Sequence, residues 1–227
     1  YNYEVQTLRI NSDNSKILIE KNINNTVQQF LPDIIVNCAA VIGMKICYEN
    51  YLLAQKINSW LPHILAKISF SNNIDFIHLS TEAVFPSNPE GKIYSEIDKP
   101  NPGTKYGKTK LEGEINALKF SNAKIIRLPR VFDRSKQIIA KIITDLEMGK
   151  TVHVVDNLYS TPVLSDLVAL EIFSLIQENV AIIDSQIIHI TGNRRISLYN
   201  LVSLLCEEKY INNIKDVSSF HFDKDPV

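Results

Sequence analysis

The chain has 227 residues, 45% of them hydrophobic and 22% charged, with a formal net charge of −1. This composition is typical of a globular protein with a sizeable core, and the balanced charge argues against a nucleic-acid or membrane-surface partner. The apolar runs are shorter than the roughly 18 residues that a membrane span needs, and no signal peptide is visible.

Three cysteines do not make a disulfide framework, so we expect a reducing, cytoplasmic location. We expect no metal site, because the histidines are scattered; His78 is expected to pack or hydrogen-bond within its strand.

Taken in chain order, the predicted elements alternate between strands and helices. The strands are short apolar runs, at 5–10, 33–40, 74–80, 123–129, 151–155 and 186–190. The helices have longer periodic patterns, at 24–33 (ending at Pro32), 50–70, 105–119, 135–149, 164–177 and 197–209. Pro62 should kink the helix at 50–70 or end it early, and Gly149 should cap the helix at 135–149. Residues 86–104 are rich in Pro, Gly, Ser and Asn, which predicts a loop.

This alternation predicts an α/β fold, a Rossmann-type doubly wound parallel sheet with helices on both faces. Ligands bind at the carboxyl ends of the strands in such sheets, and the segments NCAA, HLST and RLPR all lie at such ends. A dinucleotide-binding fold normally opens with a strand and a glycine-rich turn that holds the pyrophosphate. The chain has 7 glycines and no such turn. We therefore expect the first strand and its loop to be absent from this sequence, with loss of the loop as the alternative.

Tyr106 and Lys110 stand four residues apart in KYGKTKLEGE, so on a helix they share one face. A cation held near a phenol favours the phenolate, which makes the tyrosine a better proton donor and acceptor near neutral pH. Ser80 and Thr81, at the end of the adjacent strand, each offer a hydroxyl that completes the site. Such a trio can protonate a carbonyl oxygen while a hydride arrives at the carbonyl carbon. A solvated helix face is the alternative explanation of the pattern.

Several longer stretches carry a family resemblance. PDIIVNCAAVIG is similar to a strand-plus-alanine segment, and HLSTEAVFPSNPEGKIYSEIDKPNPGTKYGKTKLEGE to an active-site strand, loop and helix. With YLLAQKIN, VVDNLYSTPVLSDLVAL and ITGNRRISLYNLVSLL, they resemble the extended short-chain dehydrogenase/reductase family, most closely its dTDP-4-dehydrorhamnose reductase branch. The resemblance implies an NAD(P)-binding Rossmann domain at 1–132. It implies a mainly substrate-binding lobe at 133–227, with 163–192 returning to the Rossmann core.

The resemblance also implies a role for each matching residue. Tyr106 would give its proton to the carbonyl oxygen, and Lys110 would lower the phenol's pKa and hold the nicotinamide ribose. Thr81 would hydrogen-bond the substrate oxygen, with Ser80 as the second candidate. Further cofactor contacts are implied for Arg9, Ala39, Ala40, Val41, Asn58, Ser80, Leu128 and Pro129. Asn58 would act by bracing the neighbouring strand ends through its amide.

Arg9 ends the first predicted strand, where this fold usually chooses between cofactors. An acid at that point would bind the ribose 2′-hydroxyl, whereas an arginine suits a 2′-phosphate. We therefore expect NADPH, with NADH as the alternative. A surface arginine without a ligand is the other explanation of Arg9.

The chain departs from the branch on the substrate side. Glu82 and Ala83 stand where the branch usually has an aspartate and an aromatic residue, and Arg130 stands where an aromatic often contributes to the sugar site. We expect Thr81, Glu82, Ala83 and Arg130 to line the substrate site, and these departures leave the particular sugar open. Arg130 either binds a diphosphate or pairs with Glu82 or Asp133.

The resemblance implies a reductase that moves a hydride from NADPH to the 4-keto group of a nucleotide-linked deoxysugar, with the proton coming from Tyr106. One alternative is a nucleotide-sugar epimerase or dehydratase that recycles its NAD. Another is a non-catalytic regulatory subunit that binds a dinucleotide and a partner enzyme. The expected partners are a nucleotide sugar and, as in relatives, a second copy of the chain in a homodimer.

Overall fold

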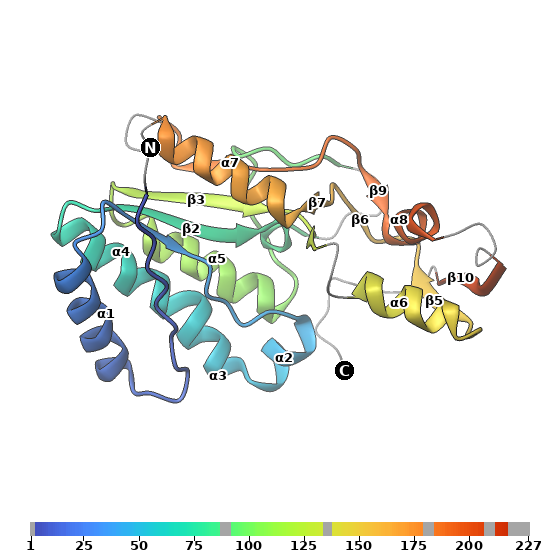
Figure 1. Cartoon of the computed structure of the whole chain (residues 1–227), viewed down its shortest axis with the longest axis horizontal. Helices are drawn as coiled ribbons and strands as arrows, with labels where there is room; N and C mark the ends of the chain where they lie inside the picture. Colours follow the sequence, from blue (N-terminus) through green and yellow to red (C-terminus); the bar gives the residue numbers. More distant parts are fainter. Residues whose placement is uncertain (1–2, 87–91, 134–137, 179–183, 207–211, 218–227) are drawn as a thin grey trace.

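A four-stranded sheet forms the centre of the protein, for which a computed structural model describes residues 3–86, 92–133, 138–178, 184–206 and 212–217 (Figure 1). The strand order is β1 (Ile34–Asn37), β2 (Asp75–Thr81), β3 (Ala123–Leu128) and β8 (Ile187–His189). Each neighbouring pair is parallel. Strand β3 is buried along its whole length, as expected of a strand that helices cover on both faces. The predicted parallel α/β sheet is confirmed.

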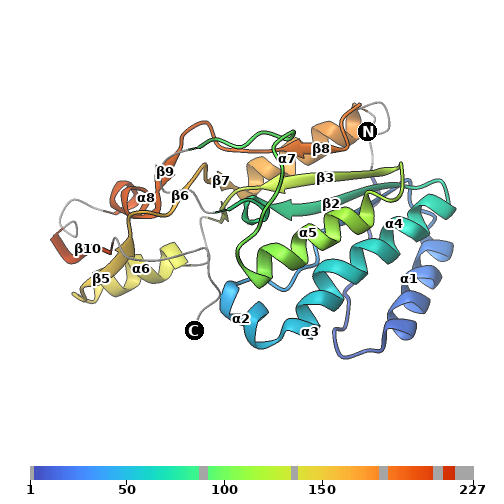
Figure 2. The same ribbon diagram turned by 180° about the vertical axis from the view of Figure 1, so that it is seen from behind.

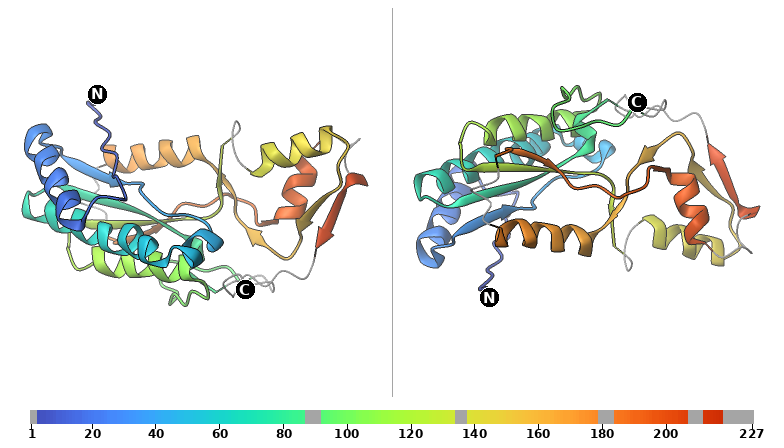
Figure 3. Two further views of the ribbon diagram at one scale, coloured as in Figure 1. Left: turned by 90° about the horizontal axis from the view of Figure 1, so that it is seen from below. Right: turned by 90° about the horizontal axis from the view of Figure 1, so that it is seen from above.

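Helices cover both faces of this sheet (Figure 3). Helices α4 (Leu61–Ser71) and α5 (Lys105–Ala117) lie on one face, and α7 (Ser165–Gln177) lies on the other. Side chains alternate along the strands, so Phe76 of β2 packs in the α4 cluster and the next residue, Ile77, packs in the α7 cluster. No helix in the described ranges is long and apolar enough to span a bilayer.

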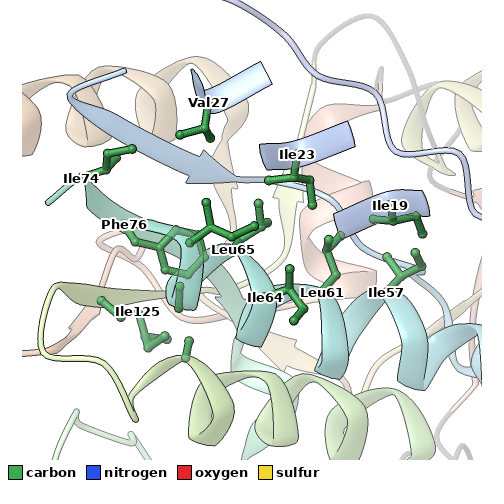
Figure 4. Packing of buried hydrophobic residues seen from close by; sticks show 14 residues of the cluster. Ile19, Ile23, Val27, Ile57, Leu61, Ile64, Leu65, Ile74, Phe76 and Ile125 are labelled. Atoms are coloured by element: carbon green, nitrogen blue, oxygen red, sulfur yellow. The ribbon is translucent and has the colours of Figure 1, made fainter. Parts of the chain in front are cut away.

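Helix α1 (Lys16–Phe30) packs beside α4 (Figure 1). The Ser15 side chain accepts a hydrogen bond from the backbone N–H of Leu18 and caps its first turn. Ile19, Ile23 and Val27 recur every four residues and are buried, and Figure 4 shows them facing the helix that contains Leu61, Ile64 and Leu65. Each such buried aliphatic side chain stabilises the fold by about 1.5–3 kcal/mol.

The helix predicted at 50–70 is observed from Tyr51 to Ser71, and it does not end early at Pro62, which lies in the first turn of α4. It consists of α3 (Tyr51–Ala54), a π-helical turn η1 (Gln55–Trp60) and α4, and a separate short helix, α2 (Met44–Glu49), precedes it. Because proline has no N–H, the carbonyl oxygen of Asn58 has no α-helical donor at position 62. That oxygen faces α5 instead, where a Cβ on Gly113 would lie 2.1 Å from it. The π-helical turn before Pro62 therefore comes close to α5.

A smaller lobe lies beside the sheet and has its own apolar cluster (Figure 2). It consists of α6 (Ile138–Glu147), β5 (Val152–Val155), α8 (Leu198–Leu205) and β10 (Ile214–Val217). Its buried residues are Leu146, Val154, Val202 and Ile214. Gly149 follows α6 with a φ of +76°, which matches the predicted cap. The domain boundaries at 132, 163 and 192 remain our interpretation.

Two short strand pairs join the lobe to the sheet. Strand β4 (Val131–Phe132) is parallel to β7 (Val163–Leu164), and β6 (Tyr159–Ser160) is antiparallel to β9 (Ile196–Ser197). The sequence did not predict these two-residue strands, because they are too short to have a periodic pattern.

The strand predicted at 5–10 is wrong. Residues 3–11 have no regular secondary structure, and Val5 is 84% exposed. A strand requires a hydrogen-bonded neighbour, and no segment in the described part of the chain pairs with this one. Arg9 therefore does not lie at a strand end, and its side chain is exposed.

Candidate active site

The carboxyl ends of β1, β2 and β3 meet at one edge of the sheet, as the sequence predicted. Helix α5 begins at this edge, where the Thr104 side chain accepts a hydrogen bond from the N–H of Gly107 at 3.1 Å. A Cβ on Gly107 would lie 2.2 Å from the carbonyl oxygen of Ala83, in the short turn η2 (Glu82–Val84) that follows β2. This close approach brings the first turn of α5 against the end of β2.

Tyr106 and Thr81 meet at this contact, and their side chains are hydrogen-bonded. Thr81 Oγ1 also accepts the N–H of Ala83 at 3.2 Å, which fixes the hydroxyl at the strand end. Burial raises the pKa of Tyr106 above its ordinary value; the Thr81 hydrogen bond lowers it, and Cys47 and Glu82 raise it further. We expected a lowered pKa for the phenol of Tyr106, but in this structure its pKa is raised, so the expectation is wrong. Burial outweighs the hydrogen bond.

Lys110 lies one turn further along α5 and is only 2% exposed. Its Nζ donates to the carbonyl oxygen of Leu79 at 2.6 Å and lies 3.4 Å from Nε2 of His78. Burial lowers the pKa of Lys110 to about 8, although the charge of Glu114 acts to raise it. None of the described carboxylates forms an ion pair with the ammonium. Lys110 is therefore a buried side chain that is still mainly charged at neutral pH but loses its proton near pH 8, whereas an ordinary lysine loses it near 10.5.

A buried ion pair next to Lys110 was not predicted from the sequence. Glu114 accepts hydrogen bonds from Nε and Nη2 of Arg127, the shorter at 2.8 Å, and both side chains are almost fully buried. Ser80 Oγ donates to Glu114 at 2.5 Å. The hydroxyl of Ser80 is thus engaged inside the protein, and Thr81 is the hydroxyl that meets Tyr106. The i+4 spacing from Lys110 to Glu114 was the available signal for this carboxylate.

The loop after β1 forms the next part of the edge. Asn58 donates to Val41 O at 2.9 Å and to Thr109 Oγ1 at 3.1 Å, and its Oδ1 accepts from Val41 N at 2.8 Å. The amide of Asn58 therefore joins the loop after β1 to α5, whereas its predicted role toward the cofactor stays a prediction. Ala39 and Ala40 are half-buried in the same loop. Their contacts with a cofactor remain predictions.

The predicted substrate side is held together by Glu82. Its Oε1 accepts from Ser160 Oγ at 2.8 Å, and Ser160 Oγ accepts from the N–H of Arg130 at 3.2 Å. Burial raises the pKa of Glu82, while the Ser160 hydrogen bond and the Arg130 guanidinium oppose the shift. The guanidinium of Arg130 is thus close enough to influence Glu82, but the two side chains form no ion pair in the described structure, and diphosphate binding by Arg130 stays a prediction. Leu128 and Pro129 are buried at the end of β3.

Comparison with known proteins identifies relatives of the chain. The profile of the RmlD substrate binding domain family matches residues 2–226. A probable low-salt glycan biosynthesis reductase, Agl14, from Haloferax volcanii is 38% identical over 102 residues, 44% of this chain and 33% of the relative. The methionine adenosyltransferase 2 subunit beta of Danio rerio is 33% identical over 132 residues, 57% of this chain and 39% of the relative.

A dTDP-4-dehydrorhamnose reductase from Salmonella typhimurium is 33% identical over 153 residues, 66% of this chain and 50% of the relative. The chain thus spans about a third to a half of the length of these curated relatives. A hypothetical dTDP-4-dehydrorhamnose reductase from Sulfolobus tokodaii has a similar structure, with a TM-score of 0.79 and 27% identity over 97% of this chain and 76% of that one. The chain belongs to the RmlD substrate binding domain family, in the dTDP-4-dehydrorhamnose reductase branch of the extended short-chain dehydrogenases/reductases.

Proposed function

We propose that the protein is an NADPH-dependent reductase of the 4-keto group of a nucleotide-linked deoxysugar. The observation that carries this proposal is the contact of Thr81 with Tyr106 at the carboxyl edge of a parallel sheet, one helical turn from the buried Lys110. Membership of the family and the names of the reductase relatives support the substrate class.

The side chains have separate tasks in this reaction. When bound, the nicotinamide supplies the hydride. Tyr106 keeps its proton at neutral pH, because burial raises its pKa, and it gives that proton to the carbonyl oxygen as alkoxide character develops there. Thr81 holds the phenol and the substrate oxygen in line. With a pKa lowered to about 8, Lys110 is still mainly charged at neutral pH, and this charge stabilises the phenolate that remains.

The described residues fit the nicotinamide half of a dinucleotide. The half-buried Ala39 and Ala40 have small side chains, so a planar ring can approach the backbone of their loop, next to Tyr106 and Lys110. The sequence contains no glycine-rich turn of the kind that holds a pyrophosphate. The preference for NADPH no longer rests on Arg9. It rests on the dTDP-4-dehydrorhamnose reductase of Bacillus anthracis, a relative in fold at 22% identity and a TM-score of 0.79, which was solved in complex with NADP.

A regulatory subunit is the second candidate, and the similarity to methionine adenosyltransferase 2 subunit beta favours it. A regulatory protein has no need of the full set of Thr81, Tyr106 and Lys110, which is why we place it second. A dehydratase that recycles its NAD would need an additional acid/base pair, of which Glu82 could supply one part. Glu82 is instead bonded to Ser160 and lies near Arg130, which argues against that task.

The test is reduction of dTDP-4-dehydrorhamnose by the purified protein, with NADPH oxidation followed optically and the sugar product by chromatography. We expect one NADPH consumed for each sugar reduced, and slower turnover with NADH. Tyr106→Phe should keep the fold and reduce turnover by at least about 100-fold. Tyr3→Phe is the matched control, because Tyr3 packs against Phe173 of α7 on the other face of the sheet.

Three outcomes would decide against the proposal. Product formation without net NADPH consumption would indicate a recycling enzyme. Wild-type turnover by Tyr106→Phe would show that the proton comes from elsewhere. Copurification with a stoichiometric enzyme partner and no reduction of the keto-sugar would favour the regulatory subunit. A cytoplasmic location and a homodimer remain predictions, which cell fractionation and sedimentation would test.

A further inference from the structure

Two polar side chains lie behind Lys110 in the interior of the sheet. Asn37 of β1 and His78 of β2 are partners in the strand register, and both are almost fully buried. Asn37 Nδ2 lies 3.0 Å from His78 Nδ1, and His78 Nε2 lies 3.4 Å from Lys110 Nζ. As expected, His78 packs within its own strand, where its ring stacks on Phe76 with 6.5 Å between the centroids, but its hydrogen-bond partners lie on other elements. Its ring connects β1 to α5.

The backbone determines which way this chain of hydrogen bonds runs. The N–H of Ala39 donates to Asn37 Oδ1 at 3.1 Å, so the NH₂ group of Asn37 faces His78. Nδ1 of His78 must then be an acceptor. Burial, and secondly the charge of Lys110, lower the pKa of His78 well below its ordinary value, so the ring is neutral. A neutral imidazole has one N–H, which leaves the proton on Nε2, facing Lys110.

An N–H directed at Lys110 distinguishes between the two forms of that side chain. An ammonium group has three donors and no acceptor, so it opposes the His78 N–H, whereas the lone pair of a neutral amine accepts it. The carbonyl oxygen of Leu79 accepts from either form. The two hydrogen-bond partners of Lys110 in the described structure are thus one acceptor and one donor, which is the pattern that suits an amine.

We propose that Asn37 and His78 are positioning residues that bias Lys110 toward its neutral amine by presenting the Nε2–H of His78 to it. The other groups that face Lys110 are Glu114 on α5 itself, Cys38 after β1 and Cys47 on α2, and their charges act in the opposite direction. The effect of this bias on the reaction rate rests on the proposed reductase function, whereas the bias itself does not. Lys110 would change its charge near pH 8, within reach of a catalytic cycle, instead of remaining a fixed cation.

The position of the ring proton is tested directly by long-range ¹H–¹⁵N correlation NMR of the histidine side chains. The His78 signals are assigned by their loss in His78→Gln. We expect a pyrrole-type Nε2 and a pyridine-type Nδ1 above the midpoint of the Lys110 titration. The opposite tautomer under those conditions would overturn the inference.

The effect on Lys110 is tested by titrating lysines labelled with ¹³C and ¹⁵N, with the Lys110 signal assigned by its loss in Lys110→Met. Asn37→Leu removes the donor that fixes the ring, so the proton can move to Nδ1 and Nε2 can accept from the ammonium. We expect the Lys110 midpoint to rise by at least about half a pH unit.

Asn122→Leu is the matched control for this titration. Asn122 donates a comparable amide hydrogen bond to Ile74 O at 2.6 Å, beside the first residues of β2, and the variant should leave the Lys110 midpoint unchanged. An unchanged midpoint in Asn37→Leu would contradict the inference, and if that variant does not fold, the tautomer of the wild-type ring decides. Neither measurement needs substrate or cofactor. An inactive reductase therefore leaves both results interpretable.

Discussion

Two buried cations lie on the same face of the sheet, and they are held in different ways. Arg127, on β3, is 3% exposed, and its guanidinium makes hydrogen bonds through two nitrogens to the carboxylate of Glu114. Lys110 is 2% exposed, and its neighbours are a backbone carbonyl and a neutral imidazole. Helix α5 supplies both Glu114 and Lys110, one turn apart, so burial and location are nearly the same for the two cations.

The difference separates a structural charge from a functional one. A buried ion destabilises a fold unless an opposite charge and hydrogen bonds compensate it, and Glu114 does this for Arg127. No carboxylate in the described residues forms such a pair with Lys110, and burial therefore lowers its pKa although the charge of Glu114 opposes the shift. A strongly shifted group at the carboxyl edge of a parallel sheet is where catalysis is expected. The comparison therefore predicts opposite effects on stability when each cation is disturbed.

Breaking the compensated pair should have the largest effect. Glu114→Ala leaves Arg127 buried without a carboxylate, and Nη1 of Arg127 already has no hydrogen-bond partner in the described structure. We expect the free energy of unfolding to fall by about 3–5 kcal/mol, measured by urea denaturation followed by circular dichroism. The double variant Glu114→Leu/Arg127→Met, which removes both charges, should recover most of the loss. A single variant as stable as the wild type would mean that the pair does not compensate the charge.

Removing the uncompensated cation should stabilise the protein. Lys110→Met keeps the side-chain volume and removes the charge. The shift of the lysine pKa from 10.5 to about 8 corresponds to a loss of about 3 kcal/mol in the free energy of unfolding of the wild type at neutral pH. Below about pH 8 the lysine is charged in both the folded and the unfolded state, so burying the charge lowers the stability of the wild type by the full amount. Between about pH 8 and 10.5 the folded protein has already lost this proton, so the loss of stability fades as the pH rises. The stability advantage of Lys110→Met in urea denaturation should therefore fade as the pH rises through that range.

The same variant should lose activity while it gains stability. Turnover in the keto-sugar assay should fall by at least about 100-fold, because the phenolate of Tyr106 loses its stabilising charge. The unfolding curve and the assay are measured on one preparation, so the two results are directly comparable. A variant that is both less stable and fully active would reverse the assignment of Lys110 as the functional cation.

The sequence predicted the elements that lie around these cations. Continuous apolar runs identified β1, β2 and β3, since strands covered on both faces have no alternation. The four-residue spacing of Tyr106 and Lys110 placed them on one face of α5, and the strand ends placed Thr81 beside them. Local patterns of this kind need no knowledge of which strands are neighbours.

Contacts that depend on strand neighbours could not be predicted. The pairing of Asn37 with His78, and that of Ser80 with Arg127, follow from the register of the sheet, which the sequence alone does not fix. The segment at 5–10 has a strand-like composition but no pairing partner in the described structure. The sign of the Tyr106 pKa shift depends on burial, which the spacing of two residues does not reveal.

The contact that holds α5 in place gives a smaller prediction. In Gly113→Ala the added Cβ would lie 2.1 Å from the carbonyl oxygen of Asn58, whose side chain is itself fixed by Val41 and Thr109. The helix must move, and we expect a loss of about 1–3 kcal/mol in the free energy of unfolding. Lys108→Ala, at an exposed position of the same helix, should change it by less than about 0.5 kcal/mol. Equal effects of the two variants would show that α5 tolerates displacement.

The smallest effect is expected at an exposed ion pair of the same chemistry. Lys45 and Glu49 approach to 3.8 Å on α2, with side chains 76% and 54% exposed. Water screens their attraction, so Glu49→Gln should change the free energy of unfolding by less than about 0.5 kcal/mol. A loss as large as that of Glu114→Ala would mean that the pairing of opposite charges itself sets the cost, wherever it occurs. Arg127 needs Glu114 because both charges are buried, whereas Lys45 and Glu49 remain in contact with water. The exposed pair therefore tests whether burial makes the loss of a charged partner costly.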